Sequence, residues 1–149
     1  MSHLILQVVK FADAKEVIQS LRSKVFQVEQ KVEPTIDFDG LDETATHILA
    51  YYASEPIGTA RIRNLNNKLA KIERVAVLST HRGQGIGKAI MKAAIVYVDS
   101  QNIAEIKVNA QLHAKAFYQK LGFEQRGDVF NEAGMAHIEM RRSKHPLAE

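Results

Sequence analysis

Three glycines in the stretch HRGQGIGKAIMKAA, residues 81–94, separate an apolar run from an alanine-rich amphipathic segment. The run before them, KIERVAVL, has the composition of a strand, so the whole segment predicts strand, glycine loop and helix. Glycine allows a tight turn and lets backbone come close to a ligand. Both alternatives require a fold in which a strand leads directly into a helix.

The remaining periodic segments place this unit in a larger sheet. Short turns join the strands expected at 47–53, 57–65 and 69–78, so we expect these strands to be antiparallel. Further helices are expected at 15–30, 86–100 and 113–123. Further strands are expected at 4–11, 105–111, 123–130 and 136–142. This order predicts one domain, residues 1–149, of the α/β (α+β) class, with a single mixed, mostly antiparallel sheet flanked by helices.

The first expected helix has two distinct faces. Asp13 and Glu16 predict a capping box at its start, and Pro34 predicts its end. Its polar face carries Arg22, Glu29 and Gln30 together with Phe26. Its apolar stripe consists of Val17, Ile18, Leu21, Val25 and Val28. The acidic segment that follows, with Asp37, Asp39, Asp42 and Glu43, is expected to be a solvated loop.

The composition excludes several kinds of site. The chain has no cysteine, which rules out disulfides, thiolate metal ligands and a cysteine nucleophile. None of its six histidines stands in H-E-x-x-H or another compact metal spacing, so we expect no metal. The net charge of +3 favours anionic ligands. The basic residues are nevertheless dispersed and tryptophan is absent, so we expect no nucleic-acid partner.

The chain also shows no sign of a membrane segment. The N-terminal run MSHLILQVVKF lacks a basic leader and a cleavage site, so it predicts a strand and not a signal peptide. No stretch approaches the roughly 18 apolar residues of a membrane span. We therefore expect a cytoplasmic protein that does not associate with membranes.

The glycine loop fits neither of two common phosphate motifs. In the nucleotide P-loop pattern, Arg82 takes the place of the first glycine and Ala89 the place of the hydroxyl residue. In the dinucleotide fingerprint, Lys88 takes the place of the third glycine. The remaining pattern, R-x-x-G-x-G from Arg82 to Gly87, still places backbone N–H groups and the positive end of a helix dipole at one point. It predicts either an anion site for a pyrophosphate or a structural turn.

Two longer segments give this loop a context. RGQGIGKA after KIERVAVL resembles the acetyl-CoA loop of the GNAT N-acetyltransferases, and VNAQLHAKAFYQKLGF resembles a later strand and helix of that fold. SLRSKVFQVEQ and NEAGMAHIEM are similar to the ElaA/YjcF-like branch of the family. The resemblance implies the GNAT fold and transfer of an acetyl group from acetyl-CoA to a primary amine. Since no cysteine is available, it implies direct attack in a ternary complex.

The resemblance also implies where the coenzyme binds. The backbone of Val75, Ala76 and Val77 would pair with the pantetheine arm, and Asn109 would contact the arm from the other side. Tyr118 would face the thioester sulfur and act as general acid. The pyrophosphate would be held by Arg82, Gly83, Gln84, Gly85, Ile86, Gly87 and Lys88.

Glu73 interrupts an apolar strand, and this position has two interpretations. Partial burial would raise its pKa and make it a general base acting through water. Alternatively, it forms a salt bridge with Arg61 or Arg63 on the adjacent strand. Strand alternation predicts that Glu73, Val75 and Val77 share one face of the sheet.

The acceptor is not specified by any segment, so a small molecule or a peptide amine remains possible. The polar face of the first helix, with Arg22, Phe26, Glu29 and Gln30, is expected to border the acceptor site, unless it is simply solvated. The resemblance suggests that His47 and His137 reach this site as well. A homodimer is possible. The alternative function is a non-catalytic acyl-CoA-binding or regulatory module.

Overall fold

The computed structural model describes residues 3–144. Its helices are α1 (Phe11–Arg22), a π-helical extension η1 (Ser23–Glu29), α2 (Pro34–Asp37), η2 (Ser79–His81), α3 (Ile86–Ser100), η3 (Leu112–Ala114) and α4 (Lys115–Lys120). Its strands are β1 (Leu4–Lys10), β2 (Thr46–Tyr52), β3 (Glu55–Asn66), β4 (Leu69–Val77), β5 (Glu105–Gln111), β6 (Glu124–Glu132) and β7 (Met135–Ser143).

All seven strands join one mixed sheet in the order β1-β2-β3-β4-β5-β7-β6. Within the described residues, β4 and β5 are the one parallel pair of neighbours, and every other pair is antiparallel. A parallel pair needs a crossover connection, and here the glycine loop and α3 supply it. The predicted fold class is therefore confirmed.

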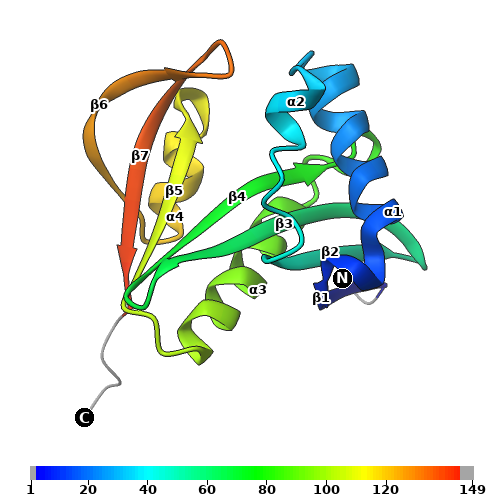
Figure 1. Ribbon diagram of the computed structural model, residues 1–149, viewed down its shortest axis with the longest axis horizontal. Coiled ribbons are helices and arrows are strands. Elements are labelled where there is room, and N and C mark those ends of the chain that lie inside the picture. Colours follow the sequence, from blue (N-terminus) through cyan, green and yellow to red (C-terminus); the bar gives the residue numbers. More distant parts are fainter. Residues whose placement is uncertain (1–2, 145–149) are drawn as a thin grey trace.

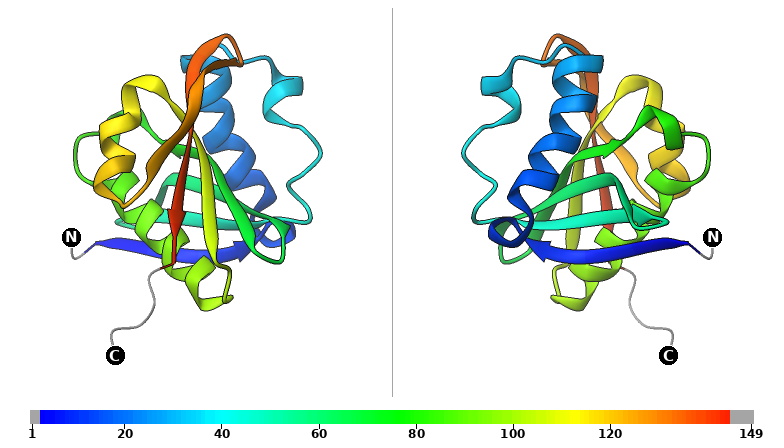
Figure 2. Two further views of the ribbon diagram at one scale, coloured as in Figure 1. Left: turned by 90° about the vertical axis from the view of Figure 1, so that its left-hand side faces the viewer. Right: turned by 90° about the vertical axis from the view of Figure 1, so that its right-hand side faces the viewer.

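Helices cover both faces of the β1–β4 half of the sheet (Figure 2). Strand alternation in β2 separates the two layers, since Ile48 and Ala50 belong to the cluster that includes α3 while Leu49 packs with residues of α1. The α3 side is the larger core, with Ile90 and Met91 fully buried in it. This packing fixes the direction in which the first turn of α3 points.

The first helix departs from its predicted pattern at both ends. It begins at Phe11 with Lys10 as N-cap, and Ala14 interrupts its first turn with a non-helical conformation. Asp13 caps no backbone amide among residues 3–144, so the predicted capping box is wrong. From Ser23 onward the backbone is π-helical, as the bond from the Gln30 amide to the Val25 carbonyl shows. A π-helix does not keep the 3.6-residue period, and Val28, predicted to be on the apolar stripe, is 71% exposed.

Pro34 also has a different role from the predicted one. It does not end the first helix but stands at the first position of α2, where a missing backbone N–H costs nothing. The chain thus leaves η1, turns at residues 30–33, and returns in α2 toward the sheet. Figure 1 shows α2 beside η1, which is the upper part of the first helix in that view, and above the end of β4.

Candidate functional site

Strands β4 and β5 separate soon after they meet. They pair only from Leu69 to Lys71 on β4, opposite Glu105 to Lys107 on β5. Beyond that point the two arrows diverge in a V (Figure 1). The edge of β4 that faces β5 is therefore free of strand partners over residues 72–77, which include the predicted coenzyme-binding residues Val75, Ala76 and Val77.

A bulge at Arg74 bends β4 where the strands separate. Arg61 pairs with Glu73 and Thr59 with Ala76, so two residues of β4, Arg74 and Val75, lie opposite one residue of β3. Arg74 has a φ of 54°, which is the left-handed region. The bulge breaks the alternation along β4, so the prediction that Glu73 and Val75 share a face does not hold in this strand.

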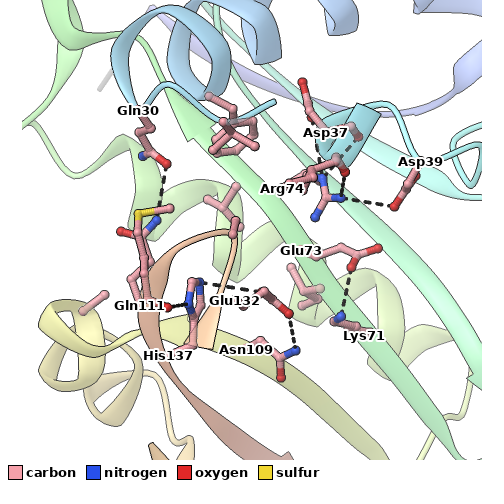
Figure 3. A pocket seen from close by; sticks show the side chains of 18 of the residues that line it. Gln30, Asp37, Asp39, Lys71, Glu73, Arg74, Asn109, Gln111, Glu132 and His137 are labelled. Carbon is pink, nitrogen blue, oxygen red and sulfur yellow. Dashed lines mark hydrogen bonds and ion pairs between the residues drawn. The ribbon is translucent and has the colours of Figure 1, made fainter. Parts of the chain in front are cut away.

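A cavity of about 500 Å³ lies where β4 and β5 diverge. It extends under η1 and α2 and reaches the hairpin between β6 and β7. Its lining includes seven of the residues predicted for the site: Phe26, Gln30, Glu73, Val75, Asn109, Tyr118 and His137. One hydrogen bond crosses it, from Gln111 Nε2 to Gln30 Oε1 at 3.3 Å, as Figure 3 shows.

The glycine loop lies at the end of β4, directly before α3. Gly83 and Gly85 have φ values of 76° and 78°, which explains glycine at these two positions. Gly87 is different, because it is helical and a Cβ there would meet Phe117 and Val77 only at an ordinary 3.9 Å. The first helical bond is donated by Ala89 to Gly85, so the amides of the first turn have no helical partner.

Arg82 lies beside this loop but is already bound within the chain. Its guanidinium donates from Nε to the Val77 carbonyl at 3.0 Å and forms an ion pair with Glu29 at the end of η1. Glu29 was predicted to border the acceptor site, yet the structure places it on Arg82 and not in the cavity lining.

Tyr118 lines the cavity from α4. Its ring packs edge-on against Phe117 and Phe123, with centroids 5.1 and 5.8 Å away. Burial raises the pKa of the phenol to about 12. The hydroxyl therefore keeps its proton at neutral pH and can act as a hydrogen-bond donor.

Glu73 is held by three cations. Its carboxylate pairs with Arg61 at 2.6 Å, with Lys71 at 3.1 Å, and with Arg63. Burial alone would raise the pKa of Glu73, but the hydrogen bond from Arg63 and the charges of Arg61 and Lys71 lower it to about 2. The structure thus shows the salt-bridge alternative. A role as general base stays a prediction, and the lowered basicity weighs against it.

The acidic segment expected to be a solvated loop is solvated only in part, because Asp39 and Glu43 are exposed whereas Asp37 and Asp42 belong to a buried ion network. Asp37 and Asp42 are 1% and 7% exposed. Arg22, expected near the acceptor, is also buried, and it bridges Asp37 at 3.0 Å and Asp42. It does not line the cavity. Carboxylates can be buried here because each has an arginine within bonding distance.

His137 projects into the cavity from β7. Its Nδ1 lies 2.8 Å from the carbonyl oxygen of Met135. A carbonyl can only accept, so Nδ1 donates and the neutral ring keeps its lone pair on Nε2. Nε2 is 3.6 Å from a carboxylate oxygen of Glu132 at the end of β6. Figure 3 shows Glu132 between His137 and Asn109.

Asn109 completes this group. Its Nδ2 donates to Glu132 at 3.2 Å, whereas its Oδ1 is buried without a hydrogen-bond partner among residues 3–144. His47, in contrast, is fully buried beside Phe11 and bonds to the Asp42 backbone, so it does not reach the cavity.

Sequence reasoning missed several residues that line the cavity. Glu132 and Arg74 are two of them, and no motif in the sequence marks either one. Lys71, Gln111 and Met135 were missed as well. A glutamate at a hairpin tip or a lysine on a strand carries no local signal, because the sheet order that brings them together is a long-range feature.

The described part of the chain contains neither of two other kinds of site. No group of three or more histidine, aspartate or glutamate side chains within residues 3–144 is arranged to hold a metal ion. In the same range, no helix has the length and apolar character needed to cross a membrane.

Comparison with known proteins gives consistent matches. Residues 13–144 match the family model described as "Acetyltransferase (GNAT) domain". YjcF of Bacillus subtilis, an uncharacterized N-acetyltransferase, is 33% identical over 82% of this chain and 87% of its own. Escherichia coli ElaA is 35% identical over 82% of both chains. Its crystal structure has a TM-score of 0.84 at 30% identity, covering 94% of this chain and 99% of that one.

A more distant structure shares the fold. It is a GNAT family acetyltransferase from Elizabethkingia anophelis, and its crystal contains acetyl-CoA. The TM-score is 0.76 at 16% identity, with 97% of this chain and 100% of that one covered.

The ion pairs of Glu73 predict a specific pH dependence of stability. A folded pKa of about 2, below the usual 4.5, contributes stability that is complete above pH 4.5 and is lost as the pH falls toward 2. The contribution is on the order of 3 kcal/mol. We expect Glu73→Gln to be less stable at pH 7 and to lose less stability on acidification. Urea unfolding between pH 7 and pH 2.5 measures this.

The control for this experiment is Glu124→Gln, which changes an exposed carboxyl group. Its stability curve should follow that of the unmodified protein. If Glu73→Gln instead loses stability between pH 4.5 and pH 2.5 as steeply as the unmodified protein, the ion pairs contribute nothing to folding.

Proposed function

The chain belongs to the GNAT acetyltransferase family, and we propose that it moves the acetyl group of acetyl-CoA to a primary amine. The observation that carries this proposal is the divergence of β4 and β5 between the glycine loop and the cavity. It offers one continuous path for a phosphate, an extended arm and a reacting carbonyl.

The glycine loop is the proposed seat of the pyrophosphate. Free amides at the start of α3, together with the positive end of its dipole, suit a doubly charged anion. Gly87 supports this assignment, since neither its conformation nor its neighbours require glycine there. A glycine would, however, let phosphate oxygens approach the backbone closely. Binding would also exchange the contact between Arg82 and Glu29 for one between Arg82 and phosphate.

The pantetheine arm would occupy the gap between the strands. Its amides can pair with the backbone of Val75 and Val77 on the side of β4 that β5 leaves open, as an added strand does. From the opposite side, Asn109 offers its unpaired Oδ1 as an acceptor. The arm would then deliver the thioester to the cavity near Tyr118.

The proposed reaction is direct transfer. The neutral amine attacks the thioester carbonyl carbon, a C–N bond forms, and the C–S bond breaks as the tetrahedral intermediate collapses. Tyr118 donates a hydrogen bond to the departing sulfur. Because the pKa of Tyr118 is about 12, its hydroxyl keeps the proton and stabilises the thiolate through this bond. The nitrogen carries an extra proton after the C–N bond forms and releases it to solvent, and the thiolate takes up a proton from solvent and leaves as the thiol of coenzyme A.

The ammonium must lose a proton before it attacks, and we assign this role to His137. Its fixed tautomer presents a lone pair on Nε2 to the cavity. The carboxylate of Glu132, 3.6 Å away, would stabilise the imidazolium that forms. Glu73 is the weaker candidate, because three cations already share its charge.

Replacing Tyr118 distinguishes an effect on the chemical step from an effect on coenzyme binding. We expect Tyr118→Phe to lower kcat by about 100-fold and to leave the Kd of acetyl-CoA unchanged, since only the hydroxyl is removed. Thiol release over a panel of primary amines gives kcat, and calorimetry gives Kd.

Tyr97→Phe is the matched control, because its hydroxyl contacts Thr46 away from the cavity and it should behave as the unmodified protein. Equal turnover in Tyr118→Phe would end the assignment. Tight coenzyme binding with no turnover on any amine would favour a non-catalytic module.

The pH dependence of kcat distinguishes His137 from Glu73. We expect His137→Gln to lose the decline of kcat on the acidic side, along with about 100-fold of rate. Glu73→Gln should keep that decline, because its carboxylate does not titrate near neutral pH. The reverse pattern would make Glu73 the base.

A further inference from the structure

The charges of the cavity are divided between two walls. One wall, formed by α2, β3, β4 and the loop before β2, is part of an ion network with four carboxylates, and each carboxylate is paired with at least two cations. Glu73 has three partners. Asp37 pairs with Arg22 and Arg74, Asp39 with Arg61 and Arg74, and Asp42 with Arg22 and Arg61.

The ion network as a whole holds one positive charge more than its carboxylates neutralise, and its members Arg22, Arg61 and Asp42 lie behind the cavity lining. Five cations meet the four carboxylates: Arg22, Arg61, Arg63, Lys71 and Arg74. Lys71 and Arg63 line the cavity, and each has ion-pair contact only with Glu73 within residues 3–144. An ammonium carries three donors and a guanidinium five. Donors of both side chains are thus available to a ligand.

The opposite wall of the cavity has an excess of negative charge instead of positive charge. Glu132 lies at the tip of β6, and its side chain is 43% exposed. Its polar contacts are a neutral amide, Asn109, and the ring of His137. Among the carboxylates that line the described cavity, Glu132 is the one without an arginine or lysine partner. Figure 3 shows Glu132 and the pair formed by Lys71 and Glu73 projecting from different strands into the same space.

We propose that the acceptor is a primary amine that also carries a carboxylate, and that diamines are rejected. The inference deepens the proposed function and rests on it. The ammonium of such an acceptor lies beside Glu132 and His137, where it loses its proton. Its carboxylate lies at Lys71 and Arg63. A second ammonium in that place would face a surplus of positive charge, which disfavours binding.

Three probes of equal chain length test this proposal: 4-aminobutanoate, butylamine and 1,4-diaminobutane. Binding to the full chain saturated with coenzyme A is measured by calorimetry, and thiol release from acetyl-CoA is measured in parallel. We expect 4-aminobutanoate to bind tightest and 1,4-diaminobutane weakest, with about tenfold between them.

Lys71→Met should reduce that preference to about twofold, because it removes the surplus cation. Arg63→Gln serves the same purpose if Lys71→Met fails to fold. Lys107→Met is the control. It removes a lysine that pairs with Glu139 outside the cavity, and it should leave the preference unchanged.

Calorimetry and thiol release together distinguish a failure of this inference from a failure of the proposed acetyl transfer. Equal or tighter binding of 1,4-diaminobutane overturns the inference, whatever the turnover. A preference that survives both Lys71→Met and Arg63→Gln overturns it too. The expected order of binding with no thiol release from any amine supports the charge selection of this cavity and contradicts acetyl transfer.

Discussion

Parallel pairing between β4 and β5 ends after three residue pairs, and the cavity exists because it ends there. A continuous ladder would close the sheet and leave no free edge on β4. The bulge at Arg74 marks the point of separation. A left-handed arginine is strained by about 1–3 kcal/mol, and its side chain is held by the Ile36 carbonyl and by Asp39. The strained residue thus also anchors α2 and the following loop over the cavity.

The ion network gives this arrangement its rigidity. It connects α1, the loop before β2, β3 and β4 through groups that are largely withdrawn from water. Removing one member of a buried pair leaves the other uncompensated, which typically costs about 3–5 kcal/mol. The loop therefore has one favourable position. The hydrogen bonds and charges of Arg61 and its neighbours also keep the pKa of Asp39 low, against the effect of burial, so the charge of this wall is constant at neutral pH.

Local patterns in the sequence were sufficient for the strands, for α3 and for the glycine loop, because alternation, apolar period and positive φ are properties of neighbouring residues. They failed where distant residues meet. Val28 fits an apolar stripe only if the helix stays α-helical, and it does not. Asp37 and Asp42 looked solvated because nothing nearby in the sequence shows that Arg22 and Arg61 surround them.

The candidate site likewise contains residues that the sequence predicts and residues that it does not. Tyr118 and Asn109 were expected from a resemblance, and both line the cavity. Arg22 and Glu29 share a helix face with two lining residues but do not line the cavity themselves. Arg22 forms an ion pair with Asp37, and Glu29 forms one with Arg82. Glu132 approaches Asn109 only because β7 lies between β5 and β6 in the sheet. That order cannot be derived from any one segment.

A crystal structure of the protein with coenzyme A tests the central claim most directly. The account predicts diphosphate density within hydrogen-bonding distance of the amides at residues 83–88, and a pantetheine arm paired with Val75 and Val77. It also predicts that Arg82 releases Glu29. Diphosphate density away from the start of α3, or an arm outside the gap between β4 and β5, would contradict it.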